Sequence, residues 1–107
     1  MSLEEAEELL EHAEGALEVA RRQQKKAESE FAFERRLFKA KMKRFKASVD
    51  RNKSSPIGQL ERYHDAKEQY TFAMVKEAHW KLFAAQAEAT YYACMCAVRD
   101  AELAAYV

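Results

Sequence analysis

The chain has 107 residues, which matches the usual size of one domain and leaves too few residues for a second hydrophobic core. It contains only two glycines and one proline, which excludes a turn-rich β-sandwich, a collagen-like repeat and a disordered linker, and its 34% of charged residues is typical of long helices. Eighteen basic side chains balance eighteen acidic ones, so the net charge alone predicts no attraction to nucleic acid, anionic membranes or acidic substrates.

A first helix is predicted from about residue 2 to residue 51. Ser2 and Glu5 form a capping box, and no proline occurs before Pro56. A seven-residue apolar repeat, typical of a helix that packs along one stripe, follows. The stripe comprises Leu3, Leu10, Leu17, Gln24, Phe31, Phe38 and Phe45, with Ala6, Ala13, Ala20 and Ala27 at the companion positions. Because alanine is small, we expect a second helix to approach closely there, and we interpret Gly15 as another point of close approach.

The sequence then predicts a turn at about residues 52–55 and a second helix from about 56 to 106. Pro56 suits the first position of a helix, and Ser54 or Ser55 suits its N-cap. The second helix carries two matching series, Ala66, Ala73, Trp80, Ala87, Cys94 and Ala101, and Tyr63, Tyr70, Glu77, Ala84, Tyr91 and Val98. So short a turn forces the helices antiparallel, with residues 31–45 opposite 63–78 and residues 3–17 opposite 92–106. The sequence therefore predicts an all-α, single-domain coiled-coil fold, a long antiparallel helical hairpin of two helices of about 50 residues each.

The second helix has more apolar surface than one partner helix can cover. Between Leu82 and Val107 only four side chains are charged, and apolar residues occur on every face. In the first helix, Phe33 and Leu37 form a pair on the side opposite the stripe. We therefore expect the hairpin to associate with a second copy as a dimeric four-helix bundle, or to dock on another protein. The predicted protein interface comprises Phe33, Leu37, Leu82, Tyr92, Cys96 and Leu103.

The charges are distributed unevenly along the chain. Residues 1–20 carry seven glutamates and no lysine or arginine, whereas residues 35–53 carry nine basic side chains and one acidic one. The helix dipole favours acidic residues at a start and basic residues at an end, but this basic block is longer than a terminal turn. It predicts a solvated face, rim contacts with the acidic end of a second copy, or contacts with phosphates. The candidate residues are Arg35, Arg36, Lys39, Lys43, Arg44 and Lys46.

The sequence offers no recognisable catalytic site. Two isolated glycines exclude a glycine-rich phosphate loop, and three scattered histidines provide no nucleophilic triad. Glu61 and His64 form an E-x-x-H step, but a second such step and a facing glutamate are missing, so we assign no metal site. Cys94 and Cys96 lie on different sides of a helix and are interpreted as buried, reduced thiols. We predict no enzymatic activity, no cofactor and no small-molecule substrate.

The sequence favours a protein-interaction module that acts as an adaptor, a scaffold element or a small inhibitor. The alternative is a dimer that binds nucleic acid through the basic block of residues 35–53, although Phe31, Phe38 and Phe45 are committed to the stripe and unavailable to stack on bases. The acidic start has no apolar signal segment, and no uncharged run is long enough for a membrane span, so we expect a cytoplasmic protein.

Overall fold

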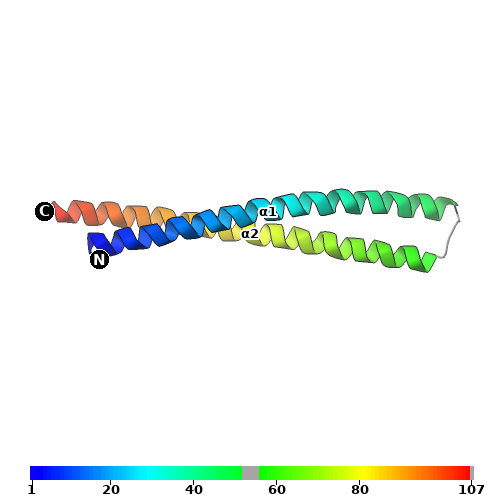
Figure 1. Cartoon of the computed structure of the whole chain (residues 1–107), viewed down its shortest axis with the longest axis horizontal. Helices are drawn as coiled ribbons and strands as arrows, with labels where there is room; N and C mark the ends of the chain where they lie inside the picture. Colours follow the sequence, from blue (N-terminus) through cyan, green and yellow to red (C-terminus); the bar gives the residue numbers. More distant parts are fainter. Residues whose placement is uncertain (52–55, 107) are drawn as a thin grey trace. The chain divides into compact units, whose positions relative to one another are not determined.

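The computed structural model describes residues 1–51 and 56–106 and contains two long helices that pack against each other (Figure 1). Helix α1 is Leu3–Arg51 and helix α2 is Pro56–Ala105. The predicted all-α helical hairpin is confirmed, and both helices end within one residue of the predicted bounds. The predicted turn at 52–55, with its Ser54 or Ser55 cap, lies outside the described residues.

The first turn of α1 is capped as its sequence predicts. The backbone N–H of Glu5 donates a hydrogen bond to the Ser2 Oγ at 3.2 Å, and the N–H of Ala6 donates to the Ser2 carbonyl at 3.0 Å. The carboxylates of Glu4 and Glu5 lie in the same turn, where the helix dipole stabilises negative charge. Ser2 therefore fixes the start of the helix by satisfying N–H groups that have no partner within it.

The chain forms two compact units, and each helix contributes to both. Unit 1 consists of Met1–Lys25 and His79–Val107, and unit 2 is Lys26–Ala78. In unit 1 the beginning of α1 and the end of α2 lie together (Figure 1).

The core of unit 1 is narrow and made of small side chains. Its buried residues are Ala6, Ala13, Leu17 and Ala20 of α1 and Ala84 of α2. Leu17 and Tyr91 line the same surface hollow, in agreement with the predicted antiparallel pairing of this part of the chain. The interpretation of Gly15 as a point of close approach is wrong, because Gly15 is exposed and a Cβ built there meets no atom within 4 Å. Residue 15 lies opposite the stripe that contacts α2, so no backbone approaches it.

Unit 2 is held together by a ladder of aromatic rings from both helices. The ring of Phe38 lies 5.0 Å from that of Tyr70 and 5.9 Å from that of Tyr63, between centroids. Phe31 lies 5.6 Å from Tyr70, and Phe45 lies 5.3 Å from Tyr63. Residue numbers rise along α1 as they fall along α2, which confirms the antiparallel direction and the predicted register of 31–45 against 63–78. Ala27, Ala66 and Ala73 are buried beside this ladder.

Two helices alone cannot enclose a large side chain. Among the described residues, every buried side chain is an alanine apart from Leu17, and none of them is polar. The larger members of the stripe, including Phe31, Phe38 and Phe45, are only half-buried. Much of the apolar surface of the hairpin therefore remains in contact with solvent.

Candidate protein-interaction surface

In unit 1, α2 turns an apolar face outward as well as inward. Its inner side packs on α1 through Ala84, Tyr91 and Cys94. At 100° per residue, another set of side chains points directly away from α1. We call this set the outer face of α2 and define it as Leu82, Ala89, Tyr92, Cys96 and Leu103.

The outer face is well exposed to solvent. The exposed fractions are 61% for Leu82, 54% for Tyr92 and 58% for Leu103, and Ala89 and Cys96 are exposed as well. Single exposed leucines are ordinary on protein surfaces, but a row repeated every seven residues forms a continuous apolar strip. All four predicted interface residues of this region, Leu82, Tyr92, Cys96 and Leu103, therefore lie on one accessible surface.

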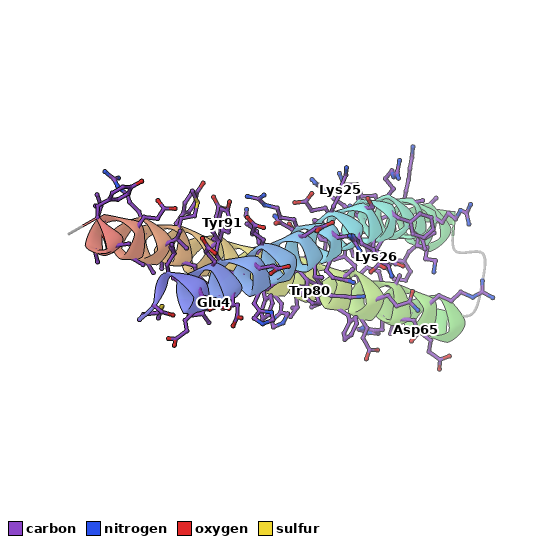
Figure 2. The ribbon with its side chains drawn as sticks, turned by 60° about the vertical axis from the view of Figure 1, so that its left-hand side comes forward. Glu4, Lys25, Lys26, Asp65, Trp80 and Tyr91 are labelled. Carbon is purple, nitrogen blue, oxygen red and sulfur yellow. The ribbon has the colours of Figure 1, made fainter. Side chains whose placement is uncertain are left out.

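In unit 1, the outer side of α1 is acidic, unlike that of α2. Its seven glutamates, Glu4, Glu5, Glu7, Glu8, Glu11, Glu14 and Glu18, are all exposed. Figure 2 shows the side chains that surround both helices, with Glu4 on α1 and Tyr91 on α2 labelled in this unit. Unit 1 thus presents an acidic surface on α1 and an apolar surface on α2.

The remaining predicted interface residues belong to unit 2. Phe33 is 57% exposed, whereas Leu37 is half-buried beside the seam, so the placement of Leu37 opposite the stripe is wrong. Phe33 lines a shallow groove of about 520 Å³ together with Phe72, an exposed residue that the sequence reasoning missed. The other lining residues are Glu30, Glu34, Asp65, Glu68, Gln69, Ala73 and Lys76, and the Lys76 Nζ lies 3.1 Å from the Glu30 Oε2.

The sequence contains a pattern from which the exposed position of Phe72 can be inferred. Val75, which is also exposed, stands seven residues before Leu82 and so begins the heptad row one step earlier than predicted. Phe72 stands three residues before Val75, which is a helical neighbour on the same side. Extending the row toward the turn would have found both residues.

The basic block of α1 is exposed where the structure describes it. Arg35, Arg36, Lys39, Lys43, Arg44 and Lys46 are all exposed. Among the described residues, no carboxylate forms an ion pair with any of the six. The nearby phenylalanines, Phe31, Phe38 and Phe45, pack against Tyr63 and Tyr70 and cannot also receive nucleic-acid bases. The block can therefore offer charge to a ligand but not aromatic rings.

The cysteines differ from their predicted environment. Cys96 is exposed and Cys94 is half-buried, so the interpretation of both as buried thiols is wrong. The reason is that residues two apart on a helix point in different directions, and only Cys94 faces α1. Neither thiol forms a disulfide in the structure.

The described part of the chain contains no cluster of three or more His, Cys, Asp or Glu side chains able to hold a metal ion. Glu61 and His64, which form the E-x-x-H step, are both exposed. Neither α1 nor α2, as far as the structure describes them, has a stretch apolar and long enough to cross a bilayer. Comparison with protein-family models, curated proteins and solved structures finds no match.

Proposed function

We propose that this protein is a non-enzymatic interaction module, an adaptor, scaffold element or small inhibitor, that self-associates through its helical hairpin. The observation that carries the proposal is the outer face of α2, an exposed apolar strip on a helix whose other side already packs on α1. A helix that is apolar nearly all round is ordinarily buried nearly all round. A dimer that buries this face in a four-helix bundle is the simplest closed assembly that satisfies α2.

The magnitudes favour apolar burial over charge as the driving force. Burying an exposed leucine fully contributes roughly 1.5 to 3 kcal/mol, so the half-exposed Leu82 and Leu103 contribute roughly 1 kcal/mol each in each copy. An exposed ion pair contributes only about 0.2 to 1 kcal/mol and is weakened by salt. The outer face therefore determines where the partner binds, and the rim charges adjust its orientation.

Sedimentation equilibrium of the wild type and of Leu82→Asp and Leu103→Asp tests this proposal. The wild type should be dimeric at micromolar concentration, and each variant should dissociate at least about tenfold more readily, because a dimer loses two leucine contacts and buries two carboxylates. Val19→Asp is the matched control, since Val19 is an equally exposed apolar residue of unit 1 on α1 instead of α2. A wild type that remains monomeric at every concentration contradicts self-association.

A second candidate function rests on the basic block. Six exposed cations without carboxylate partners in the described region favour a dimer that binds nucleic acid through its phosphates. Because the neighbouring aromatic rings are committed to Tyr63 and Tyr70, such binding would not depend on base sequence.

Titration with random duplex and single-stranded DNA at two salt concentrations tests the second candidate. Affinity should fall on the order of 10³-fold between about 50 and 200 mM salt if six or more phosphates are contacted. Lys39→Gln with Lys43→Gln should weaken binding, whereas the control Lys26→Gln with Lys67→Gln, which removes two exposed lysines outside the block, should not. Absence of binding at the lower salt concentration eliminates this function.

A further inference from the structure

We infer that the outer face of α2 binds the same face of a second copy in the antiparallel direction, about a two-fold axis that passes between residues 92 and 93. The inference rests on the proposed self-association and specifies its partner, its direction and its register. Only residues of unit 1 take part in the contact.

The spacing of the outer face is symmetric about this point. Leu82 and Leu103 are equidistant from it, and so are Ala89 and Cys96. An antiparallel second copy therefore sets Leu82 against Leu103 of the second copy, and Ala89 against Cys96 of the second copy, each contact occurring twice. A two-fold interface requires this kind of self-complementary surface.

The row between the two leucines consists of small residues. Ala89 and Cys96 are exposed between Leu82 and Leu103, and the larger Tyr92 stands at the edge of this row, beside the axis. Within the chain itself, buried alanines repeated every seven residues, such as Ala6, Ala13 and Ala20, already pack α1 on α2. The same arrangement on the outside of α2 suits a second helix at a similar distance.

The charges beside the face complement one another in this register. Lys81 and Glu102 are exposed on the same edge, and antiparallel helices bring like edges together, so Lys81 lies beside Glu102 of the second copy. Arg99 stands two heptads after Ala85 and so meets Ala85 of the second copy, whereas Asp100 stands two heptads after Gln86 and meets the uncharged Gln86 of the second copy. No like charges therefore oppose each other across the contact.

A competing dimer would place unit 1 on unit 2 of the second copy. Unit 1 has ten acidic and five basic residues, a net charge of −5, whereas unit 2 has eight acidic and thirteen basic residues, a net charge of +5. Seven of the ten acidic residues of unit 1 lie on α1, however, and exposed charges more than about 10 Å apart are largely screened at 0.1 M salt. On the outward side of α2 in unit 2, Asp65 and Glu68 stand beside Phe72 and Val75, so that surface covers the apolar strip less well.

Disulfide cross-linking tests the register directly. In a Cys94→Ser background, Ala89→Cys provides thiols at positions 89 and 96, which the antiparallel contact brings within the Cα separation of about 4.4 to 6.8 Å that a disulfide requires. Oxidised glutathione should convert this variant to a covalent dimer. Cys94→Ser alone, which retains only Cys96, and Ala89→Cys/Cys94→Ser/Cys96→Ser, which retains only position 89, are the matched controls and should remain uncross-linked.

The outcomes separate this inference from the proposed function. Cross-linking of either single-cysteine control indicates parallel helices or an antiparallel contact centred on that cysteine, and either result overturns the inference. If sedimentation shows a dimer but no cysteine variant cross-links, the contact lies elsewhere, for example on unit 2 of the second copy. This result overturns the inference, whereas the proposed self-association stands. A monomer by sedimentation overturns both.

The edge charges provide a second, non-covalent test. Lys81→Glu should raise the dimer dissociation constant about tenfold, because two favourable pairs per dimer become repulsive. Adding Glu102→Lys to the same chain restores opposite charges and should return the constant to within about threefold of the wild type. If the dimer dissociation constant of the double variant is no lower than that of Lys81→Glu alone, Lys81 and Glu102 of the second copy are not close to each other.

Discussion

At the scale of single residues, the size of the side chain decides which positions are buried. Ala6 and Ala20 are fully buried, whereas Phe38, in the neighbouring row of the same seam, is only half-buried. Two helices enclose a methyl group between their backbones, but a large ring extends beyond the seam. The stability of this hairpin therefore depends on backbone proximity at alanine and on ring contacts at phenylalanine and tyrosine.

Gly15→Ala should stabilise the protein by about 1 kcal/mol, since alanine favours the helix by that amount and its Cβ meets no atom within 4 Å. The melting temperature, followed by circular dichroism, should rise by about 4 °C. The matched control is Ala16→Gly, at the adjacent exposed position, which should lower stability by a similar amount. A lower melting temperature for Gly15→Ala would show that the glycine has a packing role.

At the scale of the helices, the sequence predicted the seam between α1 and α2 better than it predicted the residues outside the seam. The seven-residue repeat fixes the seam stripe of α1 and the pairing with α2, because one helix period determines which residues share a side. The environments of Cys96 and Gly15 were predicted wrongly. Both residues lie away from the stripe, and the repeat identifies only the residues that belong to the stripe. The exposed position of Phe72 can be inferred by extending the heptad row, but the groove that it shares with Phe33 cannot, because that groove is formed by both helices and is not encoded in the repeat of either.

Ala20→Leu should destabilise the hairpin by about 1 to 3 kcal/mol, because three added carbons must fit between two closely packed helices. Urea denaturation measures the change in the free energy of unfolding. Ala16→Leu adds the same atoms to an exposed position and should change stability by less than about 0.5 kcal/mol. Equal effects of the two substitutions would mean that the seam is loosely packed.

At the scale of the whole molecule, the proposed association would be linked to folding. The described residues bury no large side chain fully, so the isolated hairpin has little core from which to draw stability. A partner that covers the outer face of α2 binds the folded state only and stabilises it by mass action. We therefore expect the proposed association to contribute to the stability of the fold.

The melting temperature of the wild type should consequently rise with protein concentration. For a dimer, raising the concentration tenfold adds about 1.4 kcal/mol of stabilisation, which differential scanning calorimetry detects as a shift of several degrees. Leu103→Asp should melt at a lower temperature that depends less on concentration. A melting temperature of the wild type that is constant over a hundredfold range of concentration would show that the hairpin is stable alone.

The sequence by itself determined the two helices, their ends, their direction and their register. Helix caps, the proline at the start of α2 and a seven-residue period act locally or repeat along one axis, so they can be read without coordinates. Only the tertiary structure decided how deeply each side chain is buried and which exposed residues share a surface. Burial depends on how closely two backbones approach, and the meeting of Phe33 with Phe72 at one groove depends on residues far apart in the chain.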